Sequence, residues 1–245
     1  MKRFGLFKDA RDFQILFLSA FLILGIFNRD WTVRPELIIA ILVSAIAAQL
    51  IADRIFSSEN PSIRSSLITA ISLCALLRAG SISTMVIAAA ASILSKFLFR
   101  YRGKHFFNPS NFGIILVLIL TTDAWVSPGQ WGNELWFVLL FFATGGMVVQ
   151  KVGRWDTTGA FLGGYALLEF IRNQWLGWTP DVFVHKMMSG SLLLFSFFMI
   201  TDPRAIPDRK IARIFWSFFV AIMTYVLRNY YFLPTAPFWA LFALS

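Results

Sequence analysis

Two polar segments interrupt an otherwise apolar sequence and hold most of the groups that could do chemistry. In the first, residues 100–113, Asn108 stands before Pro109, which is how a capped helix begins because proline has no amide proton to leave unpaired. In the second, residues 199–210, Asp202 precedes another proline, which disfavours helical geometry at Asp202, so a helix should end there. The free amides of the helix start suit an anionic or carbonyl-bearing group, and the carbonyls near the helix end suit a cation, a hydroxyl or a ring N–H. Both segments could equally be ordinary cytoplasmic loops.

Residues that support metal, haem or nucleophile chemistry are scarce. The single cysteine, Cys74, is too few for an intramolecular disulfide, a thiolate metal site or an iron–sulfur cluster. His105 and His185 lie at the edges of different predicted spans, so we expect no bis-histidine haem. Because no HExxH, P-loop or Gly-x-Ser-x-Gly motif occurs, we predict neither a metal site nor a catalytic residue. Any electron transfer would then use an organic cofactor held by hydrogen bonds and aromatic stacking.

The composition indicates an integral membrane protein. Of 245 residues, 58% are hydrophobic, 27 are Phe and only 14% are charged, and the mean hydropathy is +0.68. A soluble domain carries about 25% charged residues. A chain of this length holds roughly ten membrane helices and leaves no room for a separate soluble catalytic domain. We attribute the net charge of +9 to membrane orientation and expect no nucleic-acid partner.

The apolar runs predict an all-α, polytopic membrane protein with ten spans. With the N-terminus in the cytoplasm, fifteen of the 22 Lys and Arg residues fall on the inner side and six on the outer, and Lys96 lies within the fourth span. This excess favours a chain with both termini in the cytoplasm. The predicted spans are 12–27, 35–52, 65–79, 82–99, 111–124, 135–150, 157–172, 186–201, 212–228 and 231–244.

Ten spans divide into two sets of five. A boundary near residue 130 gives repeats at 1–130 and 131–245, and because five is odd, the second must enter the membrane in the opposite orientation. The third span of each half is short and opens with serine, at Ser65 and at Ser189. We therefore predict two inverted five-helix repeats within one membrane domain.

A few ionisable residues lie inside the predicted spans. Lys96, Arg78 and Asp123 are close to span ends, so we expect their side chains to extend to the membrane surface. Glu169 has Arg172 three positions later, which predicts a local ion pair along one helix.

Two groups of residues resemble a known membrane family, which includes the B subunit of the sodium-translocating NADH:quinone reductase and the D subunit of the Rnf electron-transport complex. One family motif is a lysine, a glycine-rich stretch and then Gly-x-Asn-x-Phe-Asn-Pro-Ala, and the other is Thr-Asp-Pro, a second proline and a basic run. The resemblance spans roughly residues 60 to 230. The first motif is matched by Lys96, Gly103, Phe107, Asn108 and Pro109, the second by Thr201, Asp202, Pro203, Pro207, Arg209, Lys210 and Arg213, and intervening family positions by Gly145, Gly146 and residues 152–155.

This resemblance implies a ten-helix fold of inverted repeats, similar to urea and ammonium channels, and a flavin. The family holds one FMN on a threonine through a phosphoester bond, and the quinone reductase member holds a riboflavin near its Asn-x-x-Asn-Pro turn. No Gly-Ala-Thr-type sequence occurs at residues 121–130, so we expect no covalent FMN. His105 replaces the first asparagine of the turn and retains hydrogen-bonding capacity. The expected non-covalent site for riboflavin or FMN comprises Lys96, Tyr101, His105, Phe107, Asn108, Thr201 and Asp202.

Three functions remain open from the sequence. The first is a membrane subunit that binds a flavin or quinone and takes part in electron transfer with other membrane or electron-transfer subunits, without autonomous catalysis. The second is a transporter of a small polar solute or a flavin-like vitamin. The third is an accessory or structural subunit of a larger membrane complex. The family resemblance suggests the cytoplasmic (inner) membrane of a prokaryote.

Overall fold

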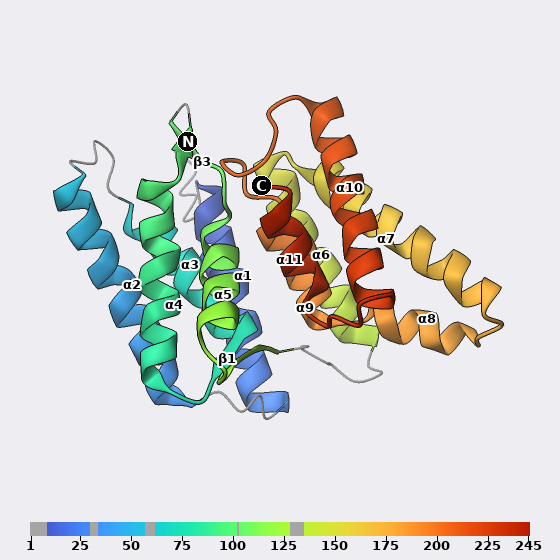
Figure 1. Ribbon diagram of the computed structural model, residues 1–245, viewed down its shortest axis with the longest axis horizontal. Helices are drawn as coiled ribbons and strands as arrows, with labels where there is room; N and C mark the ends of the chain where they lie inside the picture. Colours follow the sequence, from blue (N-terminus) through green and yellow to red (C-terminus); the bar gives the residue numbers. More distant parts are fainter. Residues whose placement is uncertain (1–8, 30–33, 57–61, 102, 128–134) are drawn as a thin grey trace, which may run out of the picture.

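The computed structural model describes residues 9–29, 34–56, 62–101, 103–127 and 135–245. Within them the chain is predominantly helical, and its helices form two adjacent groups (Figure 1). Helices α1 to α5 make one group and α6 to α11 the other, with α11 against α5. The predicted repeat boundary near residue 130, and the basic residues Lys2, Arg3, Lys8 and Arg102, lie outside the described residues.

The helices of the first group coincide with the first five predicted spans. Two of them begin at proline, where the missing amide proton leaves no additional unpaired donor. Serine side chains cap two others: Ser62 accepts from Ser65 N, and Ser81 accepts from Thr84 N. The elements are α1 (Ala10–Arg29), α2 (Pro35–Ile55), α3 (Ile63–Leu76), β1 (Leu77–Ala79), α4 (Ile82–Leu98), β2 (Arg100–Tyr101), β3 (Lys104–His105), α5 (Pro109–Leu120) and β4 (Ala124–Val126).

The second group departs from the prediction in three places, one of which is the tenth predicted span, 231–244, where only Ala236–Ala243 is helical. A short helix that the sequence did not predict, α8, separates the seventh and eighth predicted spans. The eighth span itself changes from an α-helix to a π-helix, in which Ile200 N donates to Phe195 O five residues back. The elements are α6 (Leu135–Val152), α7 (Trp155–Trp175), α8 (Pro180–Met187), α9 (Gly190–Leu194), η1 (Phe195–Met199), α10 (Lys210–Asn229) and α11 (Ala236–Ala243).

Three of the described helices, α1, α2 and α10, are long and apolar enough to cross a membrane. Shorter apolar helices occupy 63–76, 82–98, 109–120, 138–152 and 190–199. The number of spans and the inverted repeat stay predictions.

Four short strands in the described residues add a feature that an all-α prediction omitted. β1 pairs antiparallel with β4, and β2 with β3, at opposite ends of the first helix group (Figure 1). Asp123 reinforces the β1–β4 end, since its carboxylate accepts from Ser81 N at 2.9 Å and from Thr84 Oγ1 at 2.8 Å. Asp123 thus links the end of α5 to the start of α4.

The helices within each group approach closely where small residues face a neighbour. A Cβ added at Gly113 on α5 would lie 1.9 Å from Ser92 Oγ and 2.5 Å from Ala88 O of α4, so only glycine fits. Between the groups, the rings of Phe21 and Phe141 stack with centroids 4.1 Å apart. Close packing of this kind fixes the helices relative to one another.

Glu169 forms a buried polar cluster, and the predicted pair with Arg172 is wrong. Its carboxylate contacts Lys186 Nζ at 2.8 Å and accepts from Asn229 Nδ2 at 2.6 Å and Tyr165 OH at 2.9 Å. Arg172 instead lies over the ring of Trp178, 4.9 Å from its centroid. The sequence did not predict α8, and α8 places Lys186 against the buried face of α7. The cluster therefore joins α7, α8 and α10.

We expect Lys186→Met to lower the free energy of unfolding by about 3 kcal/mol, because it leaves the Glu169 carboxylate buried without its cation. In the double variant Lys186→Met/Glu169→Gln, the free energy of unfolding should fall clearly less. Denaturant unfolding of the detergent-solubilised protein measures both, with Lys210→Met, on an exposed lysine at the start of α10, as the control. Equal losses in the single and double variants would show that the ion pair does not hold this cluster together.

Candidate functional site

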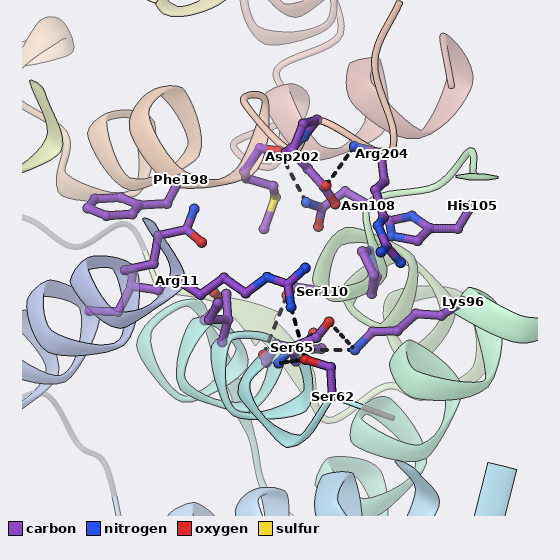
Figure 2. A pocket seen from close by; sticks show the side chains of 18 of the residues that line it. Arg11, Ser62, Ser65, Lys96, His105, Asn108, Ser110, Phe198, Asp202 and Arg204 are labelled. Atoms are coloured by element: carbon purple, nitrogen blue, oxygen red, sulfur yellow. Dashed lines mark hydrogen bonds between the residues drawn. The ribbon is translucent and has the colours of Figure 1, made fainter. Parts of the chain in front are cut away.

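A cavity of about 850 Å³ lies between the two helix groups. Its walls come from α1, α2, α3, α4, the start of α5, the end of α6, and the chain from α9 to the turn after η1 (Figure 2). The two polar segments singled out in the sequence contribute Arg100, His105, Asn108, Pro109, Ser110, Met199, Asp202, Pro203 and Arg204. Segments about a hundred residues apart in the chain thus share one site.

The structure brings four of the seven predicted binding residues to this cavity: Lys96, His105, Asn108 and Asp202. The other three lie elsewhere. Tyr101 is exposed on the β2–β3 hairpin, and Phe107 stacks on Phe242 with ring centroids 4.9 Å apart. Thr201 is buried and donates its hydroxyl to Phe197 O at 2.8 Å, which satisfies a carbonyl of the π-helix.

Asn108 holds the two polar segments together. Its side-chain oxygen accepts from Asn111 N at 3.1 Å and so caps α5, while its Nδ2 donates to Met199 O at 3.1 Å. The side chain is 7% exposed. The helix start at Asn108 and the helix end before Asp202, both predicted from the sequence, therefore meet.

A second link joins the same segments at the surface. Lys104 on the β2–β3 hairpin forms a salt bridge with Asp208, in the loop that follows the Asp202 turn. This bridge holds the pKa of Asp208 below its ordinary value. Asp208 O also accepts from Arg213, which forms a buried ion pair with Asp156 at 2.7 Å. Arg213, a residue of the family-like basic run, thus fixes the loop to α7 and α10.

Lys96 is buried in the cavity wall, although the sequence favoured an extended side chain at the membrane surface. Only 5% of the residue is exposed, and its Nζ donates to Ser65 O at 3.3 Å and to Ser65 Oγ at 3.2 Å. Arg78 also departs from that expectation: it is buried and donates to Cys74 O and Leu77 O, both at 2.8 Å. The two contacts of Lys96 are neutral oxygens, so its positive charge is not balanced by them.

His105 presents an acceptor to the site. Its Nδ1 lies 2.9 Å from Phe107 O, and because a carbonyl only accepts, we assign the proton to Nδ1. Burial lowers the pKa of His105, which favours the neutral ring. In the neutral ring with a proton on Nδ1, Nε2 can accept a hydrogen bond from a ligand.

The sequence analysis missed several cavity residues. Arg11, Ser62 and Lys151 also line the cavity, and so does Gln49. Gln49 donates to both carboxylate oxygens of Asp53 at 3.0 Å, whereas its buried Oε1 has no hydrogen-bond partner among the described residues. The sequence pattern could have indicated Gln49, because it is the one polar residue on the buried face of α2. That face consists of Leu37, Ile41, Ala45, Gln49 and Ala52.

The cavity therefore offers several kinds of contact to a ligand. Gln49 Oε1 and His105 Nε2 are acceptors, Lys96 Nζ and several serine hydroxyls are donors, and Phe97 and Phe198 supply apolar wall. This combination of acceptors, donors and apolar wall suits a planar polar molecule with an aromatic face. Among the described residues, no group of three or more His, Cys, Asp or Glu side chains could hold a metal ion.

Comparison with known proteins finds a family and relatives that match part of the chain. The model of the NQR2, RnfD, RnfE family matches residues 122–243, which include the Asp202 turn and begin after the Asn108 turn. The chain is 26% identical over 104 residues to the D subunit of the ion-translocating oxidoreductase complex of Actinobacillus pleuropneumoniae serotype 5b, a match that covers 42% of this chain and 30% of that protein. It is 32% identical over 108 residues to the protein of the same name from Aeromonas hydrophila, covering 41% of this chain and 29% of that protein. The matched region thus spans less than a third of the length of these relatives.

Replacing Asn108 should separate the two polar segments. Asn108→Asp keeps the acceptor for Asn111 N but loses the donor to Met199 O, so we expect faster amide hydrogen exchange at residues 199–204 while α5 stays protected. Asn108→Ala loses both contacts and should also lower the free energy of unfolding by about 2 kcal/mol, roughly 1 for the cap and 1 for the hydrogen bond. Ser62→Ala, which removes the cap of α3, serves as the control. Unchanged exchange at 199–204 in Asn108→Asp would contradict the link.

Proposed function

Because the chain belongs to the NQR2, RnfD, RnfE family, we propose that it is a membrane protein that holds a flavin or quinone non-covalently and takes part in membrane electron transfer as one subunit among several. The observation that carries this proposal is the cavity to which both family-like motifs contribute, through Lys96, Asn108 and Asp202.

The size and lining of the cavity suit such a ligand. Pockets for small ligands and cofactors measure about 300 to 1,000 Å³, and this one is about 850 Å³. An isoalloxazine ring carries carbonyl acceptors and an N–H donor on one edge, and a quinone carries two carbonyl acceptors. Lys96 and the serine hydroxyls would serve the acceptors, and Gln49 Oε1 or His105 Nε2 the donor. Phe97 and Phe198 would contact the apolar parts.

Once bound, a flavin or quinone would supply the one- or two-electron chemistry that this chain's side chains lack. The residues of the chain would bind and orient it. The positive charge of Lys96, whose contacts are neutral, would favour a ligand that gains negative charge on reduction. Neutral His105, with Nε2 as acceptor, would hold or pass on a proton at the same wall.

A non-covalent mode fits the residues that follow α5. Thr121 is the C-cap residue of α5 and donates its hydroxyl to Val117 O at 2.7 Å, as a residue that closes a helix. The described part of the loop, through residue 127, has no Gly-Ala-Thr-type sequence. We therefore infer that a flavin would be held by the cavity and not by a phosphoester bond.

Partners and location belong to the same proposal. The relatives are named as subunits of an ion-translocating oxidoreductase complex, which supports a role for this chain beside other membrane subunits. The family resemblance supports the cytoplasmic membrane of a prokaryote as its location. The basic residues that the ten-span topology puts on one side support an orientation with both termini in the cytoplasm.

The test is the chromophore content of the full chain purified in a mild detergent. We expect flavin absorbance that leaves the protein on denaturation, or a quinone in the organic extract. Gln49→Leu and His105→Ala should each weaken binding about tenfold, because each removes a hydrogen bond in a buried site. His185→Ala, on the histidine of α8 that lies outside the cavity, should bind as the wild type does.

A protein that carries neither ligand, and binds neither when they are added, would rule out the redox function. If proteoliposomes of that protein then accumulated a small solute, the transporter alternative would take its place. Co-purification with a larger complex, without either property, would favour an accessory role.

A further inference from the structure

The charges around the cavity are strongly unequal. Among the described residues, its lining includes five Lys or Arg residues but only two carboxylates, Asp9 and Asp202. Asp9 is already 3.7 Å from Arg64, and Asp202 accepts the backbone N–H of Arg204 at 3.1 Å. The cations are Arg11, Lys96, Arg100, Lys151 and Arg204.

Four of these cations contact neutral groups: Arg11, Lys96, Arg100 and Lys151. Arg11 donates to Ser62 Oγ at 3.1 Å, and Arg100 Nε donates to Lys96 O. Lys151 Nζ lies 4.6 Å from the centroid of the Phe13 ring. Among the described residues, no carboxylate lies within ion-pair distance of any of the five cations. Like charges gathered in a partly enclosed space repel one another, and a bound anion would offset that repulsion.

The donors are arranged around one part of the cavity. Figure 2 shows Arg11 extending from α1 toward Ser62 and Ser110, while Arg204 lies on the opposite wall beside His105. Ser62 and Ser65 form the cap and first turn of α3, a 14-residue helix whose positive dipole end is at this place. Lys96, 5% exposed, lines the cavity from α4 and donates to Ser65. Arginine forks, serine hydroxyls and a helix start are the groups that bind phosphate in proteins.

From this arrangement the geometry points to a phosphate monoester as the group that the cavity recognises, held between Arg11 and Arg204. This inference rests on the proposed function, because it names the form of the ligand in the same cavity: a phosphorylated flavin in place of riboflavin. A phospholipid with a terminal phosphate carries the same chemistry, and the experiment must separate the two sources.

The test compares FMN with riboflavin, which share one ring system and differ by the phosphate. Titration of the ligand-free full chain in detergent, followed by flavin fluorescence, should show FMN binding at least about tenfold more tightly, as expected for one charge-assisted hydrogen bond. Arg11→Gln and Arg204→Gln should each weaken FMN binding about tenfold and leave riboflavin binding unchanged. Arg34→Gln is the matched control, since Arg34 pairs with Glu36 at 3.1 Å and lies outside the cavity.

Each outcome separates this inference from the proposed function. Equal affinity for FMN and riboflavin would overturn the phosphate site and leave the flavin function standing. Binding of phosphatidic acid in mixed micelles that depends on Arg11 and Arg204, without binding of either flavin, would keep the phosphate site, assign it to a lipid and remove flavin from the proposed function. Failure of FMN, riboflavin, phosphatidic acid and a quinone to bind would overturn both.

Discussion

One side chain, Asn108, decides whether the two halves of the molecule share a site. Its oxygen completes the start of α5 and its nitrogen completes the end of η1, so a helix start and a helix end become a single unit. Without it, each half would carry a polar break next to apolar surroundings, with backbone groups left unpaired. Because both breaks are paired with each other, the space beside them can stay polar while the helices around it stay apolar.

In an apolar chain of this kind, every backbone polar group that is shielded from water needs a hydrogen-bond partner within the protein. The pairing through Asn108 meets this requirement at the two breaks. Helices meet it along most of the chain. Where they stop, strands β1 and β4 pair, Asp123 binds the amide of Ser81, and Thr158 Oγ1 donates to Ser196 O at 2.7 Å inside the π-helix. Polar side chains at the helix ends thus supply the hydrogen bonds that solvent supplies in a soluble protein.

The sequence predicted what local chemistry determines. The membrane character, the helix positions and the cap at Asn108 followed from apolar runs and proline positions, and the family from two short motifs. Contacts across the fold could not be predicted in this way: Glu169 pairs with Lys186 because an unexpected helix, α8, returns to α7. For the same reason Arg11 and Gln49 of the candidate site were missed, and Tyr101, Phe107 and Thr201 lie outside its lining. Which face of a helix meets which neighbour is a tertiary property.

The contact between the two halves depends on how the π-helix η1 is wound. A π-helix turns through a smaller angle per residue than an α-helix, so the five residues from Phe195 to Met199 fix the direction in which the Met199 carbonyl points. Ordinary α-helical winding through the same residues would rotate that carbonyl away from Asn108. A one-residue insertion or deletion in η1 would therefore rotate the residues after it relative to Asn108. Chain length in this segment should be far less free to vary than amino-acid identity.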